Sequence, residues 1–382
     1  MKIIQTEGLV IKNWCEDIEE SALEQAVNLA KWPHAFKHIA LMPDAHFGFG
    51  MPIGGILASK DHIIPNAVGM DIGCGVLAVK TRLNTITTEE IKQILSKIRK
   101  NIPLGFNHRK TPLELTPPPK DAIISTQQYK KATYQVGTLG GGNHFIEIQK
   151  GSDGHIWFML HSGSRNIGAT VATHYNQVAK DVNIAAGDAH HPKVGLAYLH
   201  INSKEAKSYI ADMTYCQSFA KHNRKIMADY IVNAFEDAMG QGIELKRHDV
   251  HHNFAALEEH FGERVWVHRK GATSAQKGEV GLIPGSQGTK SYIVIGKGNP
   301  DSFNSCSHGA GRKMGRKEAQ RSLSLEKEIE ILNKKGIVHA LRGKRDLDEA
   351  TSAYKDIDEV INAQRDLVDV DVELLPLGVI KA

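Results

Sequence analysis

Apolar residues recur along the chain with two different spacings. Intervals of three and four residues, typical of amphipathic helices, occur in Ala22–Leu29, Glu89–Ile98, Lys204–Phe235 and Leu325–Leu332. Short apolar runs, typical of buried strands, occur in His38–Met42, Val76–Val79, Ile156–Leu160, Arg264–Val267 and Tyr292–Ile295. These helices and strands do not alternate in a regular strand–helix–strand order. The pattern therefore predicts the α+β fold class.

Proline marks one clear interruption of this pattern. Residues Thr111–Lys120 contain four prolines and are predicted to form a surface connector. The sequence has no internal repeat and no convincing linker elsewhere. We therefore expect one large domain over residues 1–382.

Composition narrows the class of protein. With 41% hydrophobic and 24% charged residues, the 382-residue chain falls in the range of globular proteins. Its net charge of +4 permits a polyanionic partner without requiring one. No apolar run approaches the roughly 18 residues that span a bilayer, and Met1–Trp14 lacks a signal peptide's apolar segment. Four scattered cysteines are too few for a disulfide framework, so we expect free thiols and a cytoplasmic protein without membrane attachment.

Many of the 35 glycines lie in short polar loops that also carry His, Asp or Cys. Glycine lets the backbone turn tightly or approach a ligand closely. Core packing does not readily explain the repeated combination of glycine with ligand-type side chains. The loops are Pro43–Gly50, Gly69–Gly75, Gly140–His144, His161–Arg165, Pro284–Gly288 and His308–Arg312.

Five residues in or near these loops have the chemistry of metal ligands. Asp71 and Cys74 are three positions apart, a spacing that can aim a carboxylate and a thiolate at one point. His144, His161 and His252 supply candidate imidazoles. Such a set can hold two divalent ions with open positions for substrate oxygens. The alternative is that each histidine bonds only to backbone and that Cys74 is a small buried residue.

The loop His308–Arg312 has the chemistry of an anion site. It precedes a helix-compatible basic run, Lys313–Leu325, and backbone amides at a helix start bind anions. Arg312 can bind a phosphate with two hydrogen bonds, and His308 can act as a nucleophile as well as a donor. The alternative is a solvated basic helix after a tight turn.

Two better-known nucleotide motifs are absent. Thr289 separates Gly288 from Lys290, so the spacing of a P-loop is not met. Gly140–Gly142 does not match the dinucleotide-binding turn, and Ser286 does not lie in a G-x-S-x-G elbow. The sequence therefore argues against a P-loop NTPase and a Rossmann dehydrogenase.

The ordered set of motifs closely resembles the RtcB RNA ligases, from about residue 38 to the carboxyl terminus. Several of these motifs are close to unique to that family. They are Pro43–His46, Asp71–Gly75, Gly141–Phe145 with Glu147, His161–Arg165, His252–Asn253, Arg269–Ala272, Pro284–Ser286, His308–Arg312 and Ala353–Asp356.

The resemblance implies an α+β domain with mixed sheets around a central metal and nucleotide cleft. It implies a GTP-dependent ligase that joins an RNA 3′-phosphate or 2′,3′-cyclic phosphate to a 5′-hydroxyl, in tRNA splicing or RNA repair. Two Mn²⁺ ions would be held by Asp71, Cys74, His144, His161 and His252, and His308 would form a covalent guanylate. The nucleotide would be held by Asn143, Glu147, Ser286, Ser291, His308, Gly309, Ala310, Gly311, Tyr354 and Lys381.

RNA contacts are harder to place, because Lys and Arg are spread along the chain. Candidate phosphate or RNA contacts are Arg165, Arg269, Lys270 and Arg312, and backbone-dominated, salt-sensitive binding is expected. Two alternatives to the ligase remain. One is a two-metal phosphatase or cyclic phosphodiesterase that acts on RNA ends without guanylylation. The other is a non-catalytic RNA-binding paralogue; the need for an activating protein partner is left open.

Overall fold

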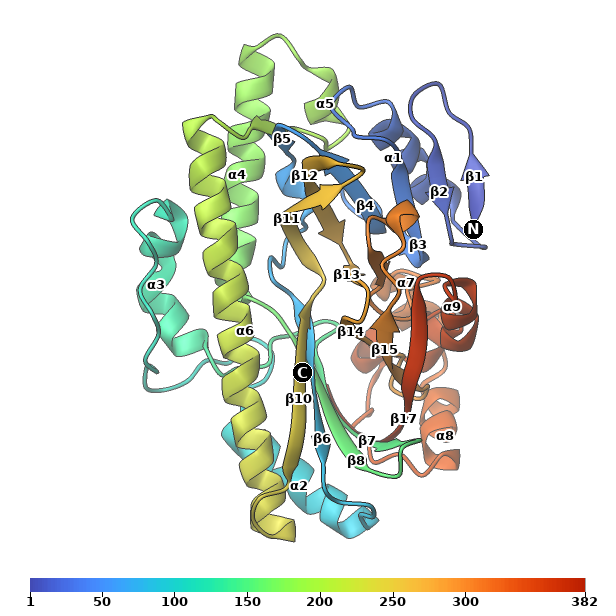
Figure 1. Ribbon diagram of the computed structural model, residues 1–382. Helices are drawn as coiled ribbons and strands as arrows, with labels where there is room; N and C mark the ends of the chain where they lie inside the picture. The colour runs from blue at the N-terminus through green and yellow to red at the C-terminus, as the bar shows by residue number, and fades with distance from the viewer. Residues whose placement is uncertain (382) are drawn as a thin grey trace.

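The computed structural model describes residues 1–381 and contains two large sheets flanked by helices (Figure 1). The six-stranded sheet is antiparallel except for the parallel pair β2 and β3. In order, its strands are β1 (Lys2–Ile4), β2 (Ile11–Asn13), β3 (Ile39–His46), β4 (Ile53–Ser59), β12 (Glu263–Lys270) and β11 (Asn253–His260).

The seven-stranded sheet is antiparallel throughout. In order, its strands are β10 (Glu244–His251), β6 (Gly75–Thr81), β8 (Ile156–Ser162), β7 (Phe145–Gly151), β17 (Val368–Lys381), β15 (Ser291–Gly296) and β14 (Val280–Ile283). Two small ribbons complete the strands: β13 (Ala272–Ser274) with β16 (Ser305–Ser307), and β5 (His62–Ile63) with β9 (Leu199–His200).

Helices cover the sheets on both sides (Figure 1). The long helix α6 packs against α2, α3 and α4 on one side, and α7, α8 and α9 lie on the other. The helices are α1 (Glu20–Ala30), α2 (Thr88–Asn101), α3 (Ile123–Gln135), α4 (Arg165–Ala185), α5 (His190–Lys193), α6 (Lys204–Met239), α7 (Arg316–Ser322), α8 (Leu325–Lys334) and α9 (Ile357–Ala363). Within residues 1–381, no helix combines the length and apolar character needed to cross a membrane.

The α+β class predicted from the sequence is confirmed, and each of the four helices and five strands named there is present. The prediction of one basic helix over Lys313–Leu325 is wrong. The helix α7 covers only Arg316–Ser322, because Gly315 is extended at its start and Leu323 is extended at its end, and Leu325 begins a separate helix, α8. The proline-rich stretch Thr111–Lys120 lies between α2 and α3 as an irregular segment, and Leu115 within it is buried.

The strand ends bring the predicted functional loops to one place. β10 ends at His251 and β11 begins at Asn253, so His252 lies where the chain leaves one large sheet for the other. Cys74 directly precedes β6, and His144 directly precedes β7. The loops therefore meet where the two sheets join.

A buried arginine on α6 fastens two of these loops. Arg224 is fully buried and bonds Asp249 of β10 through Nε at 2.8 Å. Its Nη1 donates to the backbone oxygens of Gly73 at 3.0 Å and Ser162 at 2.9 Å. One side chain thus ties helix α6 to the loop before β6 and to the end of β8.

We expect Arg224→Ala to lower the free energy of unfolding by about 3–5 kcal/mol, because the change leaves the Asp249 carboxylate without its partner in a largely buried place. Urea denaturation measures this loss. Lys225→Ala is the matched control, since its ion pair with Asp229 is exposed and is expected to contribute less than about 1 kcal/mol. Equal losses for the two variants would contradict the anchoring role.

Candidate active site

The five predicted metal ligands meet in one buried cluster. Cys74 Sγ lies 3.2 Å from His161 Nε2 and 3.5 Å from His144 Nε2. His252 Nε2 lies 3.2 Å from His161 Nε2, and Asp71 Oδ2 lies 3.2 Å from His144 Nε2. The sequence separates Asp71 from His252 by 181 positions, so only the fold brings them together.

Strand register places these side chains. His161 on β8 pairs across the sheet with Val76 of β6 and with Phe145 of β7. This register sets its ring beside the residues that precede those two strands. The backbone N–H of His252 donates to the backbone oxygen of Cys74 at 2.9 Å, which holds these two residues next to each other.

Each atom that converges in this cluster can donate an electron pair to a cation. His161 Nδ1 bonds to the backbone oxygen of Asn143 at 3.0 Å, so the Nε2 that faces Cys74 and His252 carries a lone pair. Nδ1 of His144 and of His252 is buried without a protein partner. Lone pairs that face each other in a buried place repel unless a proton or a cation lies between them. The arrangement fits a divalent metal site with nitrogen, sulfur and oxygen ligands.

The ionisation of the cluster is set by its burial. Burial lowers the pKa of His161 and of His252 well below the ordinary value, and neighbouring histidines add to the effect. Both rings are therefore neutral, as metal ligands must be. Burial raises the pKa of the Cys74 thiol, and the Asp71 carboxylate raises it further. Although burial opposes it, hydrogen bonds from His144 and Ser164 lower the pKa of Asp71 to about 2.

His308, the predicted nucleophile, lies beside this cluster. Its ring centroid is 4.9 Å from that of His252. Its Nδ1 lies 2.6 Å from Oδ2 of Asp44, a fully buried carboxylate on β3. This pairing makes Nδ1 the protonated nitrogen and leaves Nε2 free for chemistry. Gly271 opposite has φ +61°, and a Cβ there would meet His308 Cε1 at 3.0 Å.

The loop that carries His308 does not open a helix, contrary to the prediction. α7 begins only at Arg316. The amides of His308 and Gly309 donate to Asp44 Oδ2 at 3.0 and 3.2 Å. These two amides are therefore used to hold the carboxylate that orients the histidine, and they do not form an anion site at a helix start.

A cavity of about 580 Å³ adjoins His308 and His161. Its volume is in the range of small-molecule sites. The following residues that were predicted to hold a nucleotide line it: Asn143, Glu147, Ser286, His308, Gly309, Ala310, Gly311, Tyr354 and Lys381. Ser291 is buried and is not among the lining residues; its hydroxyl accepts hydrogen bonds from Gln149 at 3.1 Å and from the Gly285 amide at 3.2 Å.

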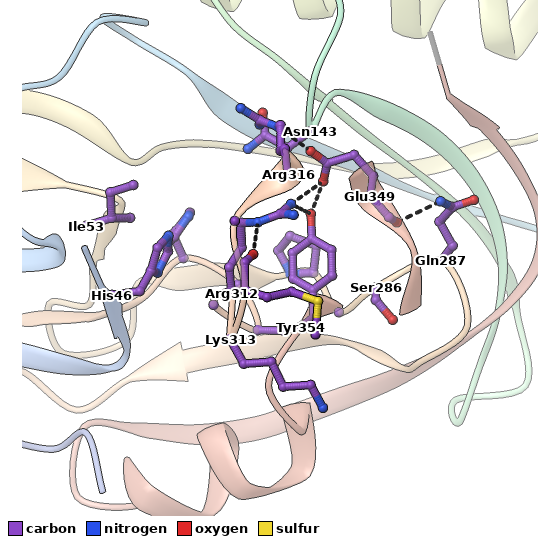
Figure 2. Close-up of a pocket in the computed structure, with 18 of the residues that line it drawn as sticks. His46, Ile53, Asn143, Ser286, Gln287, Arg312, Lys313, Arg316, Glu349 and Tyr354 are labelled. Atoms are coloured by element: carbon purple, nitrogen blue, oxygen red, sulfur yellow. Dashed lines mark hydrogen bonds and ion pairs between the residues drawn. The ribbon is translucent and has the colours of Figure 1, made fainter. Parts of the chain in front are cut away.

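Glu349 is the centre of a charged cluster in the cavity wall that the sequence analysis did not assign (Figure 2). Its carboxylate accepts from Arg312 Nη1 at 3.1 Å, from Arg316 Nε at 2.7 Å and from the Tyr354 hydroxyl. Lys381 Nζ lies 3.9 Å away. Burial opposes ionisation, but these cations lower the pKa of Glu349. The ionised carboxylate therefore fixes Tyr354 and Lys381 at the cavity.

The four predicted phosphate or RNA contacts have different surroundings. Arg165 is half-buried and bonds Thr138 Oγ1 at 2.9 Å. Lys270 is buried, which lowers its pKa to about 7, and it donates to the Phe49 oxygen. Arg312 uses all three of its nitrogens within the protein.

The burial of Arg269 argues against the predicted RNA contact. This residue is fully buried, with Nη1 and Nη2 on the Glu258 carboxylate and Nε on the Ser305 hydroxyl at 2.9 Å. A guanidinium without exposed surface cannot reach a polyanion in solvent. Its part is to join β12 to β11 and β16.

Glu147 gives a pH-dependent test of the cavity. Burial raises its pKa to about 8, although Gln149 and Lys381 oppose the shift. The carboxyl group of Glu147 loses its proton near pH 4.5 in the unfolded chain but keeps it to about pH 8 in the folded protein. The stability that the protonated group contributes is therefore complete below pH 4.5 and is lost as pH rises to 8. We expect Glu147→Gln to gain stability relative to the wild type across that interval, measured by urea unfolding at several pH values. The exposed Glu16→Gln serves as the control; a pH-independent difference for Glu147→Gln would contradict a raised pKa.

Comparison with known proteins is consistent with this geometry. The family model described as tRNA-splicing ligase RtcB matches residues 25–118 and 116–382. The chain is 37% identical to the RNA-splicing ligase RtcB of Escherichia coli strain K12, over 100% of this chain and 99% of the relative. It is 32% identical to the tRNA-splicing ligase RtcB of Archaeoglobus fulgidus, over 88% and 86% of the two chains, and 31% identical to that of Thermococcus kodakarensis, over 88% and 85%. The chain belongs to the RtcB family of RNA-splicing ligases.

Proposed function

We propose that this protein is a cytoplasmic, GTP-dependent RNA ligase that joins a 3′-phosphate or 2′,3′-cyclic phosphate end to a 5′-hydroxyl end, in tRNA splicing or RNA repair. Family membership supports RNA ligation. The observation that carries the mechanism is the 2.6 Å contact between His308 Nδ1 and Asp44, beside a buried cluster of ligand-type side chains. Four buried cysteines without disulfide bonds support the proposed cytoplasmic location, because the cytoplasm is a reducing compartment.

The first step would use the free nitrogen of His308. Because Asp44 accepts the Nδ1 proton, Nε2 presents its lone pair to the α-phosphate of GTP. A nitrogen–phosphorus bond forms, the bond from that phosphorus to pyrophosphate breaks, and the buried carboxylate stabilises the positive charge that develops on the ring. The product is guanylate attached to His308.

The cavity would hold the guanylate during this step. Tyr354 and Lys381 would contact the base, and the Glu349 carboxylate holds both in place. Asn143 and Glu147 line the same cavity and would contact the guanylate. A pKa of about 8 leaves Glu147 protonated at neutral pH, so it can donate a hydrogen bond there.

Guanylate would then pass to RNA. An oxygen of the RNA 3′-phosphate attacks the guanylate phosphorus, and His308 leaves as the imidazole that started the cycle. The 5′-hydroxyl next attacks the activated 3′-phosphate and loses its proton to solvent, GMP leaves with the bonding electrons, and a phosphodiester remains. A 2′,3′-cyclic phosphate would first be opened by water to a 3′-phosphate.

Two divalent ions, with Mn²⁺ the proposed metal, would be held by the ligand cluster described above. When bound, they would supply charge neutralisation and orientation for the reacting phosphate oxygens. The convergence of imidazole nitrogens on Cys74 Sγ supports this assignment, because imidazole and thiolate are ligands that divalent transition metals take. Binding would release the Cys74 proton, since burial keeps the metal-free thiol protonated.

Labelling tests the covalent step. We expect wild-type protein incubated with Mn²⁺ and α-labelled GTP to carry a label that is acid-labile and base-stable, and His308→Ala to carry none. Label on His308→Ala equal to that of the wild type would contradict the nucleophile assignment. Turnover of RNA ends without GTP and without any label would support the two-metal phosphatase or cyclic phosphodiesterase instead.

Asp44→Asn tests how His308 is oriented. An asparagine retains the size of the side chain but lacks the charge that holds the Nδ1 proton, so guanylylation is expected to slow by about 10²–10⁴-fold. The measurement is the single-turnover rate of labelling, with circular dichroism to check the fold. Asp369→Asn is the matched control, because that carboxylate is exposed in a surface ion pair. An unchanged rate in Asp44→Asn would show that the carboxylate is only structural.

Paired RNA ends test the substrate. With GTP and each divalent metal in turn, joining of 3′-phosphate to 5′-hydroxyl ends is expected, with the highest yield in Mn²⁺. The product is measured on a denaturing gel after phosphatase treatment, which removes phosphate from unjoined ends only. Joining of 3′-hydroxyl to 5′-phosphate ends would contradict the proposal, and tight RNA binding without turnover under any metal would indicate a non-catalytic paralogue.

A further inference from the structure

A second cluster of ligand-type side chains lies away from the active site, at the end of the molecule that carries β5 and α5 (Figure 1). It contains His34, in the loop that follows α1, Asp61, in the turn between β4 and β5, and His62, the first residue of β5. We propose that these three residues form a separate site for a divalent transition metal such as Zn²⁺. The inference is independent of the proposed ligase mechanism.

The distances support shared coordination. One ring nitrogen of His34, one of His62 and a carboxylate oxygen of Asp61 all lie within 4.8 Å of one another. His62 Nδ1 lies 2.8 Å from Asp61 Oδ1, and the two imidazole rings have centroids 3.8 Å apart with a tilt of 32°. Ligand atoms about 2.1 Å from a tetrahedral Zn²⁺ are about 3.4 Å apart. Small rotations of the side chains are therefore enough to place all three atoms on one ion.

The surroundings hold the rings while leaving access for an ion. Trp32 packs edge-on against His34 and His62, with centroids 5.3 and 6.2 Å away, and Tyr198 packs against both at 5.2 Å. The His62 side chain is 10% exposed, whereas that of Asp61 is 56% exposed. The cluster therefore combines an ordered interior wall with an open side for water or a further ligand.

A third imidazole lies close by. β5 pairs with β9, and in this register His62 is opposite His200, with ring centroids 5.1 Å apart. The Nδ1 of His200 accepts the backbone N–H of Asn202 at 3.2 Å, so Nε2 is the nitrogen left for a metal. This histidine can complete a tetrahedral set of three imidazoles and one carboxylate.

The ligand chemistry distinguishes this site from the active site. Imidazole and carboxylate together suit Zn²⁺ and its neighbours among the divalent transition metals. There is no thiol among its three ligands, whereas Cys74 belongs to the active-site cluster. An ion here would join the loop after α1 to the β4–β5 turn, and so would stabilise the fold without touching the nucleotide cavity.

Metal content measures the proposal. After equilibrium dialysis of the full chain against buffered free Zn²⁺, His34→Asn and Asp61→Asn are each expected to hold one Zn²⁺ per chain less than the wild type, with affinity at this site reduced about 100-fold. Cys74→Ala should retain this ion. His174→Asn is the matched control, since His174 is exposed on α4 and lies outside the cluster.

Cobalt provides the second readout. Co²⁺ bound to a thiolate absorbs in the near ultraviolet, and this band reports the Cys74 cluster alone. His34→Asn and Asp61→Asn should therefore keep the band. Both variants should lose one equivalent of Co²⁺ absorption in the visible range. Zn²⁺ should also raise the Tm of the wild type by several degrees more than that of either variant. If both variants bind as much Zn²⁺ as the wild type, or if both lose the thiolate band with the ion, the proposal is wrong. Asp61→Asn keeps the test valid if His34→Asn fails to fold, because Asp61 is largely exposed.

Discussion

The active site depends on one electrostatic constraint, which is the burial of several electron-pair donors that face one another. Nε2 of His161 lies 3.2 Å from both Cys74 Sγ and His252 Nε2, and the buried Nδ1 of His252 has no partner among the described residues. Such an arrangement costs free energy in the metal-free protein. The fold sustains it because the Cys and His members of the cluster lie at or next to the ends of strands whose ladders are already fixed. Arg224 adds to this by holding the carbonyl groups of two ligand loops.

The cavity beside His308 is governed by a different balance of charge. The Glu349 carboxylate accepts one hydrogen bond from Arg312 and one from Arg316. The guanidinium of Arg312 lies 5.0 Å from the centroid of the Tyr354 ring. Because the cations are already paired with this carboxylate, the cavity wall is ordered without an anion present. Arg312 and Arg316 thus serve first to position an aromatic ring, and of these two Arg316, with half of its side chain exposed, retains surface for another partner.

The sequence predicted what local pattern and side-chain chemistry determine. Apolar spacing located four helices and five strands, and loops that combine glycine with ligand-type residues located most of the side chains that meet in the buried cluster. It did not identify Asp44 or Glu349 as partners, because each acts through a residue that only the fold brings near. Asp44 lies 264 positions from His308 in the chain. The burial of Arg269 was missed for the same reason: its partner Glu258 is on the neighbouring strand, and pairing register is not visible in charge composition.

Two buried histidines show when an imidazole is held by backbone hydrogen bonds alone and when it is not. His268 is fully buried, and its Nε2 accepts the Ile64 amide at 3.1 Å while Nδ1 bonds the Leu57 oxygen at 3.2 Å. Both nitrogens are satisfied by backbone, so this ring needs no ion. His252 is equally enclosed, but its Nδ1 has no partner in the described chain and its Nε2 faces His161. The two histidines therefore differ in the partners of their nitrogens and not in their charge, since burial alone neutralises both rings.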